Sequence, residues 1–320
     1  MRQRPPADNL QGGSARVEDG GTSPELSVVI ASVNGYGYIA ECLRALERQR
    51  GRGRAEVIVV EASGNGAAER IARDFPWATV VPAAAPRPIP ELRSVGIRRA
   101  RAGIVVTTED HCVFAEDWFD QILHAHEAHP HAAIGGAVEN ASRARLVDWA
   151  AYLCEYGSFM LPFAAGASAA LPGPNVSYRR SVLEQAAGDL LARGVWENVI
   201  HDRLRARGEQ LWLEPSIVVY HKKTFAFWEF LTQRYYFGRS YAATRVQEAP
   251  WSRRAFFVAV SLLLPPLFLW RYLRNVLVRR RFVRELLLAI PLLAIFAAAW
   301  SVGEFFGYAF GDGGASRRVK

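Results

Sequence analysis

The sequence predicts an α/β fold in which a mostly parallel sheet carries helices on both of its faces. Four short apolar runs rich in valine and isoleucine predict strands, at residues 26–32, 55–63, 78–83 and 104–110. Runs that are apolar at nearly every position are typical of strands buried on both faces. Amphipathic stretches separate these runs, and this alternation favours parallel strands that are joined by helices.

Each stretch between the predicted strands carries a helix signal. Residues 38–49 place isoleucine and leucines at helical spacing, and residues 64–75 begin in a glycine-rich turn. Residues 89–103 contain Pro90 near the first turn and Gly103 beyond the last one. Proline and glycine favour these two places in a helix, so the three stretches predict three helices.

The second half of the chain has a mixed pattern. Residues 131–140 predict a strand, residues 145–159 a helix, and residues 176–185 a short strand that leads into a helix. A further helix is expected after residue 195, followed by a pair of strands within residues 209–221. The stretch "HAHEAHPH", residues 124–131, precedes these regions. It predicts a solvated helix end, because its histidines lack a zinc-type pair backed by a third ligand.

Polar side chains follow several of the predicted strands at their carboxyl ends. Asn34 follows the first strand, Glu61 lies near the end of the second, and Glu109 and Asp110 end the fourth. Ligands of open α/β sheets bind beyond these ends. Paired carboxylates after an apolar strand either turn into solvent or hold a divalent cation, and the pattern of residues alone leaves both open.

Composition restricts the class of protein and of partner. Hydrophobic residues make up 50% of the 320 residues and charged residues 22%, which excludes a disordered chain. The net charge of +8 indicates an anionic partner. Six arginines lie close together between two apolar segments, which favours lipid headgroups over nucleic acid; they are Arg271, Arg274, Arg279, Arg280, Arg281 and Arg284. Three widely spaced cysteines predict a reducing compartment.

Five segments in order carry a resemblance to a known family. They are "LSVVIASVNGYGYIAECLRAL", "EVIVVEASGNGAAERI", "LRSVGIRRARAGIVVTTEDH", "GPNVSYRRSVL" and "GVWENVIHDRLRARGEQLWLEPSIVVYH". The chain resembles membrane-anchored, bacterial-type family-2 glycosyltransferases of the GT-A fold over about residues 26–223. The resemblance implies inverting transfer of a sugar from a nucleotide-diphosphate donor.

The resemblance assigns residues to the donor side of the site. Ser32 and Asn34 match the loop under the nucleobase, and Glu61 stands where the family has an aspartate that binds base or ribose. Arg93 matches a position that supports the diphosphate, and Glu109 lies beside the metal motif. These five residues are the predicted nucleotide-sugar contacts, together with the aspartate that follows Glu109.

A divalent cation is the expected cofactor. It neutralises the diphosphate that leaves when the sugar is transferred, and oxygen ligands suit Mg²⁺ or Mn²⁺. Asp110 is the first choice as ligand, and His111 falls where the family often has its last aspartate. His221 matches a histidine that lies near the diphosphate. Imidazole ligands tilt the expectation slightly toward Mn²⁺.

The catalytic base is the point at which the chain departs from the family. The family usually has Glu-Asp, with the aspartate as base, whereas this chain has Glu197 followed by Asn198. An amide cannot take a proton, so Glu197 is the predicted base and the alternative is that it caps its helix. Asn175 and Asn198 are predicted on the acceptor side of the site.

The domain division follows from composition and resemblance. The predicted regions are a disordered tail (1–25) that lacks the apolar core of a signal peptide, a catalytic domain (26–223), an interfacial helix rich in aromatic residues and arginine (224–250), two membrane-embedded segments (within 251–310), and a basic tail (311–320).

The two apolar segments cover residues 255–270 and 286–303. The second is long enough to cross a bilayer. Pro265 and Pro266 interrupt the first, which either spans or is re-entrant. If both crossed, a cytosolic catalytic domain would leave the arginine-rich loop outside, against the positive-inside tendency, whereas a re-entrant first segment keeps the arginines inside.

These observations predict a membrane enzyme with its catalytic domain on the cytoplasmic face. It transfers a sugar from a nucleotide-diphosphate donor to a lipid-linked or cell-envelope polysaccharide acceptor, with membrane lipids as a further partner and no nucleic acid. The alternative is a catalytically degenerate member that binds nucleotide sugar or acts as a scaffold. Glu61, His111 and Asn198 motivate this alternative, because each departs from the usual family pattern.

Overall fold

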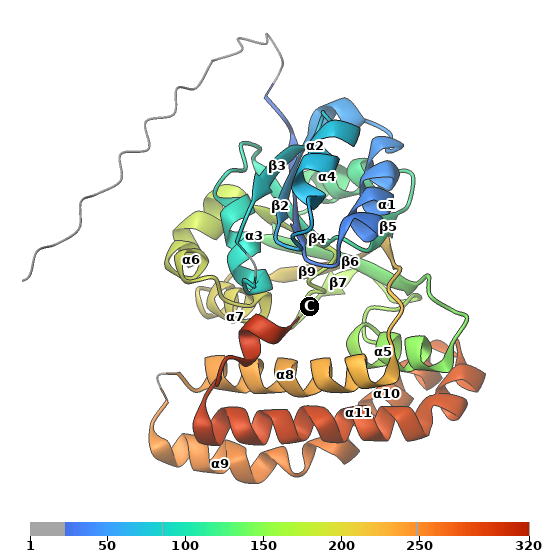
Figure 1. Cartoon of the computed structure of the whole chain (residues 1–320), viewed down its shortest axis with the longest axis vertical. Helices are drawn as coiled ribbons and strands as arrows, with labels where there is room; N and C mark the ends of the chain where they lie inside the picture. The colour runs from blue at the N-terminus through green and yellow to red at the C-terminus, as the bar shows by residue number, and fades with distance from the viewer. Residues whose placement is uncertain (1–22, 85, 248, 320) are drawn as a thin grey trace, which may run out of the picture.

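The structure is a computed structural model that describes residues 23–84, 86–247 and 249–319. Residues 1–22 of the predicted disordered tail lie outside these described residues. Within them, nine strands form one sheet in the order β3-β2-β1-β4-β8-β6-β9-β5, and β7 pairs with β9. The sheet and its helices make up residues 26–221, called here the sheet region (Figure 1).

The first half of the sheet region alternates strands and helices as expected. Strands β1 to β4 pair in parallel, with Ser32 opposite Glu61 at the carboxyl ends of β1 and β2. The elements are β1 (Leu26–Ser32), α1 (Tyr36–Glu47), β2 (Ala55–Glu61), α2 (Ala67–Asp74), β3 (Thr79–Pro82), α3 (Ile89–Ile97) and β4 (Ile104–Glu109). The α/β class and the parallel sheet are confirmed.

The second half adds antiparallel pairs. Strand β8 runs antiparallel to both β4 and β6. The elements are β5 (Cys112–Phe114), α4 (Trp118–Ala128), β6 (Ala133–Asn140), α5 (Leu146–Glu155), β7 (Gly166–Ala167), β8 (Val176–Arg179), α6 (Arg180–Arg193), α7 (Glu197–Ala206) and β9 (Leu211–His221).

The predicted pair of strands within residues 209–221 is wrong, because β9 is a single long strand. Its pairing with β6 shifts register: Gly136 faces Glu214, and the next residue, Ala137, faces Val218. The extra residues on β9 form a bulge that contains Pro215, which has no N–H to give to a ladder.

Two cores hold helices on the two faces of the sheet. One face buries Trp118 and Phe119 of α4 with the apolar side of α1. The other buries Leu92 of α3 with the helices α6 and α7. Burial on both faces accounts for strands that are apolar at nearly every position.

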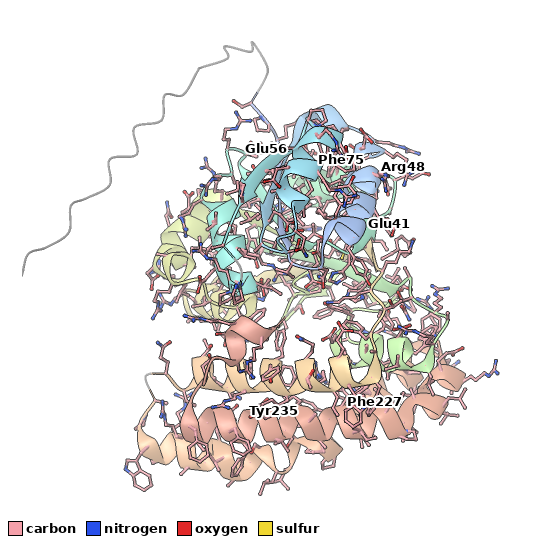
Figure 2. All side chains as sticks on the ribbon, viewed as in Figure 1. Glu41, Arg48, Glu56, Phe75, Phe227 and Tyr235 are labelled. Carbon is pink, nitrogen blue, oxygen red and sulfur yellow. The ribbon has the colours of Figure 1, made fainter. Side chains whose placement is uncertain are left out.

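Below the sheet region lies a layer of helices, called here the helical layer (residues 227–319). Figure 1 shows α8 next to the sheet region, α11 alongside α8, and α9 on the far side. Its elements are α8 (Phe227–Arg245), α9 (Trp251–Ser261), α10 (Leu264–Arg279), α11 (Val283–Phe310) and a short 3-10 helix, η2 (Ala315–Arg318). Two residues of α8, Phe227 and Tyr235, are labelled in Figure 2. The ring of Phe227 contacts that of Phe296 in α11, and the ring of Tyr235 contacts that of Phe306.

The first predicted apolar segment, residues 255–270, crosses from α9 into α10, and the second, residues 286–303, lies within α11. Among the described residues, α11 is the helix that is long and apolar enough to cross a membrane by itself. Helices α9 and α10 meet at a bend of 62°. The bend lies just before the proline pair, because Pro265 and Pro266 occupy the first turn of α10, where a missing N–H costs nothing.

Glycines let α8 and α11 approach each other closely. A Cβ on Gly238 of α8 would collide with the backbone of Trp300, and a Cβ on Gly303 would collide with that of Tyr235. Gly307 lies in the same way against Arg239. The two helices are therefore in backbone contact along much of their length.

Candidate active site

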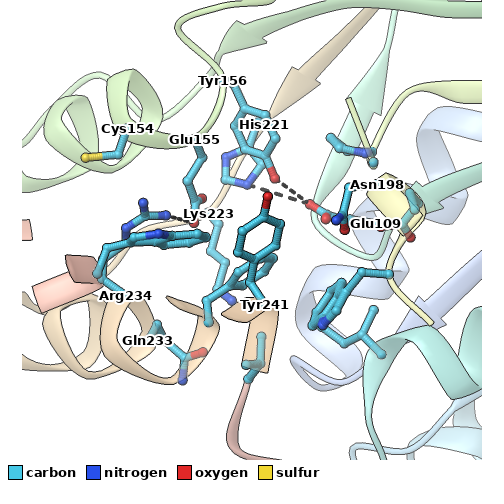
Figure 3. Close-up of a pocket in the computed structure, with 18 of the residues that line it drawn as sticks. Glu109, Cys154, Glu155, Tyr156, Asn198, His221, Lys223, Gln233, Arg234 and Tyr241 are labelled. Carbon is cyan, nitrogen blue, oxygen red and sulfur yellow. Dashed lines mark hydrogen bonds and ion pairs between the residues drawn. The ribbon is translucent and has the colours of Figure 1, made fainter. Parts of the chain in front are cut away.

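A cavity of about 480 Å³ lies between the carboxyl ends of the central strands and the helical layer. Most of the predicted site residues line its upper end, next to the sheet: Asn34, Arg93, Glu109, Asp110, His111, Glu197, Asn198 and His221. Figure 3 shows Glu109, Asn198 and His221 in this part of the cavity. Three predicted residues do not line it: Ser32, Glu61 and Asn175.

Asp110 ties the loop after β1 to the end of β4. One oxygen accepts the backbone N–H groups of Val33, at 2.8 Å, and Asn34, at 2.9 Å. The other oxygen lies 2.8 Å from both the Asn34 amide nitrogen and His111 Nδ1. Burial raises the pKa of Asp110, but the His111 and Asn34 contacts outweigh burial and lower it. Both carboxylate oxygens are thus occupied by the chain itself.

Three other side chains converge at the end of β4. His111 Nε2 lies 3.2 Å from Glu109 Oε2 and 2.9 Å from His221 Nε2. His221 Nε2 is 3.9 Å from the same Glu109 oxygen. The pairing of β5 with β9 explains the convergence. Strand β5 begins at Cys112, which lies opposite His221, so His111 is brought next to His221.

The three side chains fit a divalent cation. Two ligands about 2.1 Å from one ion at a right angle are about 3.0 Å apart, close to the separation of the two imidazole nitrogens. One carboxylate and two imidazoles suit Mn²⁺ better than Mg²⁺, which prefers oxygen. Glu109, His111 and His221 can therefore hold a metal ion together.

The electrostatics of this group favour a charged carboxylate. Burial raises the pKa of Glu109, but His111 and Arg93 outweigh it and hold this pKa well below its ordinary value. Burial, followed by the neighbouring His111, lowers the pKa of His221. An ionised Glu109 and a neutral His221 are the forms that bind metal. Burial lowers the pKa of His111, but Asp110 and Glu109 outweigh it and raise this pKa, so a metal ion would have to displace a proton from His111.

Arg93 lies buried between two acids. Its Nη2 is 3.1 Å from Glu109 Oε1, and its Nη1 forms a very short ion pair with Glu197. Burial lowers the pKa of Arg93, but Glu197 and Glu109 outweigh it and raise the pKa. Tyr156 OH donates to the second Glu109 oxygen at 3.2 Å, as Figure 3 shows. Glu197 lies in the first turn of α7, lines the cavity and pairs with Arg93. It therefore has a contact in the cavity and is not solely a helix cap.

Ser32 and Glu61 lie side by side at the ends of β1 and β2, next to the cavity. Glu61 Oε1 accepts the N–H of Ser63, at 2.5 Å, and the Ser63 hydroxyl. Glu61 Oε2 and Ser32 Oγ are buried and have no hydrogen-bond partner among the described residues. Unpaired buried oxygens at strand ends indicate a ligand that satisfies them.

The two predicted acceptor-side asparagines occupy different places. Asn175 is fully buried and donates to the carbonyls of Ala137, at 2.9 Å, and Ile217, at 3.0 Å. It also accepts from Trp118 Nε1 at 3.0 Å. These bonds join β6, β9 and α4, so Asn175 fixes the sheet beneath the site. Asn198 lines the cavity.

The expectation of a solvated helix end for the histidine-rich stretch is wrong for one residue. His126 is buried and lies 2.8 Å from Ser177 Oγ, and burial lowers its pKa to about 3. His129 and His131 stack on Trp212, with ring centroids 4.6 and 4.8 Å away. His124 is exposed. The stretch covers the sheet rather than binding metal.

Sequence reasoning missed residues from α5 and from the helical layer. Glu155 ends α5 and Tyr156 follows it, and Arg234, Tyr241 and Trp300 come from α8 and α11. All five line the cavity. The alternation of charged and aromatic residues within "RYYFGRSY" was a signal, but it does not say which side of α8 faces the site.

Comparison with known proteins adds three findings. The family described as "Glycosyl transferase family 2" matches residues 27–186. The mannosyltransferase PcManGT from Pyrobaculum calidifontis, solved with GDP-Man and Mn²⁺, is similar over 92% of this chain and 91% of its own, with a TM-score of 0.53 and 18% identity. This likeness extends the shared fold into the helical layer. A search of curated proteins found no match.

Staphylococcus aureus TarS, residues 1–349 in complex with UDP-GlcNAc, is similar over 63% of this chain at 13% identity, with a TM-score of 0.49. This chain spans 59% of that protein's length.

Proposed function

This chain belongs to glycosyl transferase family 2, and we propose that it transfers a sugar, with inversion, from a nucleotide-diphosphate donor to a lipid-linked or cell-envelope glycan acceptor. One observation carries the proposal. Glu109, His111 and His221 converge in the same cavity as Glu197, with Arg93 between the two acids. The cavity therefore brings together groups that suit a diphosphate and a group that suits a hydroxyl proton.

The donor lies at the sheet edge in this proposal. Asn34 lines the cavity there, and the nucleoside would reach past it to satisfy the unpaired oxygens of Ser32 and Glu61. Glu109, His111 and His221 would hold the cation, which is Mn²⁺ or Mg²⁺. A bound cation neutralises the leaving diphosphate. Asp110 acts through its hydrogen bonds to the loop after β1, and it holds Asn34 and His111 in place.

Glu197 is the proposed base. Its carboxylate takes the proton of the acceptor hydroxyl, whose oxygen forms a bond to the anomeric carbon of the sugar. The bond from that carbon to the diphosphate oxygen breaks, and the electron pair leaves with the diphosphate. Arg93 orients Glu197 through their ion pair, and Asn198 lines the same part of the cavity, where it could bind the acceptor.

The acceptor enters from the helical layer, which forms the other end of the cavity. Exposed apolar side chains on α9, α10 and α11 support attachment to membrane lipids. In this proposal the sheet region lies on the cytoplasmic side. The donors GDP-mannose and UDP-N-acetylglucosamine, found in proteins of similar fold, are first choices for a donor screen.

The second candidate function is a catalytically degenerate member that binds nucleotide sugar without transfer. The Arg93–Glu197 ion pair favours it, because one oxygen of the carboxylate is already taken by a cationic partner. The test is hydrolysis of a panel of nucleotide sugars with Mn²⁺ by the full chain in detergent. We expect slow hydrolysis of at least one donor, lost in Glu109→Gln and kept in Glu116→Gln, an exposed acid. Donor binding without any hydrolysis or transfer would support the second candidate.

A further inference from the structure

The lower end of the cavity, which the helical layer forms, has its own electrostatic character. Its charged lining consists of four basic and two acidic side chains: Lys223, Arg234, Arg245, Arg271, Glu155 and Glu304. The upper end has the opposite balance, because Glu109, Asp110 and Glu197 face one arginine there. The two ends of one cavity thus suit different ligands.

Arg234 is the unusual member of the lower end. It is 5% exposed, and its Nε has no hydrogen-bond partner among the described residues. Its Nη1 lies 3.6 Å from Glu155 Oε1, beyond hydrogen-bond length, as Figure 3 shows. The guanidinium lies over the ring of Trp300, 4.1 Å from its centroid. A buried arginine with unused donors costs free energy unless a ligand satisfies them.

Glu304, the other acid at the lower end, does not accept a hydrogen bond from Arg234. It accepts instead from Trp300 Nε1, at 2.5 Å, and from Tyr308 OH, at 2.7 Å. Arg271 lies on the neighbouring helix α10, is exposed, and contacts the rings of Phe268 and Tyr272. Arg234 and Arg271 therefore reach the lower end from two helices, with aromatic rings beside each.

We propose that the lower end of the cavity binds a phosphate group of the acceptor. The planar guanidinium fork matches phosphate oxygens, and among the described residues the Nε donor of Arg234 has no partner. Phosphate could come from a lipid phosphate or from a soluble phosphate ester. The aromatic walls and the apolar outer face of the layer favour the lipid. This inference rests on the proposed function, because it concerns the acceptor of that transfer.

The experiment measures binding to the full chain in detergent, with chelator and without donor. Farnesyl phosphate, farnesol and inorganic phosphate are the three probes. We expect farnesyl phosphate to bind most tightly, and Arg271→Gln to weaken its binding about tenfold. Arg274→Gln is the matched control, because Arg274 is exposed on the same helix but does not line the cavity.

Other outcomes overturn the inference or one part of it. Equal binding of farnesol and farnesyl phosphate would overturn the phosphate site, and equal binding of inorganic phosphate would overturn the lipid source. Unchanged binding in both Arg271→Gln and Arg234→Gln would overturn the location. Donor hydrolysis is measured in parallel on the wild-type chain and on Arg274→Gln, which lies outside the cavity lining, and should be equal in the two. A failed inference therefore differs from a failed glycosyltransferase assignment, which would abolish hydrolysis in the wild-type chain.

A second inference concerns how the helical layer meets the membrane. Helix α11 has 28 residues and a length of about 42 Å, which exceeds the roughly 30 Å of a hydrocarbon core. If α11 crossed a bilayer, its two ends would lie on opposite sides of it.

The first end of α11 is fastened to the sheet region. Arg281, two residues before the helix, forms a two-bond ion pair with Glu139 of β6, at 2.9 and 3.0 Å. Arg279 donates to the carbonyls of Met160, at 2.6 Å, and Ser158, at 2.8 Å. The ring of Phe282 lies 4.7 Å from Trp149 of α5.

The second end of α11 returns to the same side. Arg239 of α8 donates to the carbonyl of Gly311 at 3.0 Å, and Gln233 of α8 donates to that of Arg318 at 3.0 Å. Val319 then lines the active-site cavity. Figure 1 shows this last segment rising from α11 toward the sheet region.

Helix α8, which lies along α11, is itself tied to the sheet region. Trp196, next to the proposed base, donates to Ser240 of α8 at 3.2 Å and stacks on Phe237. The geometry thus points to α11 lying in the plane of the membrane, with both ends on the side of the sheet region. The lipid-facing surface is the outer face of the layer, which exposes Trp251, Leu263, Trp270, Leu288, Ile295 and Phe310.

The test uses added cysteines in the full chain in membrane vesicles of known orientation, because Cys42, Cys112 and Cys154 are buried. We expect Arg284→Cys, in the first turn of α11, and Arg317→Cys, in η2 after its last turn, to react with a membrane-impermeant maleimide from one side. That side is the one from which Glu127→Cys of the sheet region reacts. Ile295→Cys should react at least about tenfold more slowly, because it faces lipid.

Labelling of the two ends from opposite sides would overturn the in-plane arrangement. Failure of the purified chain to float with vesicles of phosphatidylethanolamine and phosphatidylglycerol would overturn the bilayer as the partner of this face. Self-association of the chain without vesicle binding would assign the face to a second copy instead.

Discussion

Arg93 and Glu197, which are 104 residues apart in the sequence, form a buried ion pair at the upper end of the cavity. Arg93 also contacts Glu109, so one guanidinium joins the proposed base to the proposed metal group. The helix before β4 and the helix before β9 are thereby held in one arrangement. A change at Arg93 should therefore affect both the stability and the activity of the enzyme.

Replacing Arg93 with methionine should lower the free energy of unfolding by about 3–5 kcal/mol, because two acids lose their buried partner. Sugar transfer should also be lost. Chemical denaturation in detergent measures the first effect. Arg101→Met is the control: Arg101 is 71% exposed and pairs with Glu56, and its loss should cost less than about 1 kcal/mol. Equal losses in the two variants would contradict the role of the buried pair.

His221→Ala should weaken Mn²⁺ binding by at least about tenfold, the lower bound for losing even an outer partner of a metal ligand. Titration of the chain with Mn²⁺, followed by electron paramagnetic resonance of the free ion, measures this directly. His131→Ala, which removes a ring that stacks on Trp212, should bind Mn²⁺ as the wild type does. Unchanged affinity in His221→Ala would remove His221 from the ligand set.

Asp110→Asn distinguishes the two ligand sets that sequence and structure suggest. If Asp110 were the main ligand, as the sequence predicts, its loss should weaken Mn²⁺ binding more than Glu109→Gln does. The hydrogen bonds of Asp110 to Val33 and Asn34 lead us to expect the reverse order. Asp110→Asn should mainly loosen the loop after β1, which faster proteolysis there would report.

Acid should destabilise the protein through His126, whose pKa burial lowers to about 3. The unfolded chain titrates near 6.5, so it binds more protons than the folded chain between pH 6.5 and 3. The stability from neutral His126 is therefore fully present above pH 6.5 and is lost as pH falls, by about 2 kcal/mol at pH 5. His201, whose pKa burial lowers to about 4, acts in the same direction.

The matched variants are His126→Gln and His124→Gln. The first should be less stable at pH 8 and should lose less stability between pH 8 and pH 5, whereas exposed His124 should leave the pH profile unchanged. Chemical denaturation at several pH values measures both. An identical slope in the wild type and His126→Gln would show that another group controls the acid response.

The parallel half of the fold could be predicted from the sequence because its signals are local. The runs around Val28 and Val106 are apolar on both faces, and Pro90 marks the start of a helix. The strand ends also predicted which side of the sheet carries the site. The pattern could not say, however, that the loop after β1 and His111 would occupy both oxygens of Asp110, while Glu109 lies beside the two histidines.

Other features depend on contacts between distant segments. The pairing of Arg93 with Glu197 and the return of Val319 to the cavity leave no local pattern. The bulge at Pro215 arises from the pairing of β9 with β6, so the local pattern predicts a pair of strands where there is one. Hydropathy likewise predicted the apolar middle of α11, residues 286–303, but not the contacts at both of its ends, on which the proposed orientation rests.

The close packing of α8 on α11 should depend on Gly303. A side chain there would collide with the backbone of Tyr235, which cannot move aside as a flexible side chain can. Gly303→Leu should therefore lower the unfolding temperature and cost about 1–3 kcal/mol or more. Gly188→Leu is the control, because a Cβ on this helical glycine of α6 meets open space. Similar melting temperatures for the two variants would contradict the close approach.

The base is tested by a pair of changes at adjacent residues. Glu197→Gln should remove transfer by 10²–10⁴-fold, the usual worth of general-base assistance, and should leave donor binding nearly intact. Donor binding depends instead on the metal group and the loop at Asn34. A loss under about tenfold would exclude Glu197 as the base. Asn198→Asp creates the usual acidic pair of the family. It should be tolerated or raise the rate, because a further carboxylate then lines the cavity directly beside Glu197. If this change instead weakens acceptor binding with an unchanged donor affinity, Asn198 holds an acceptor hydroxyl through its amide, and Glu197 acts alone.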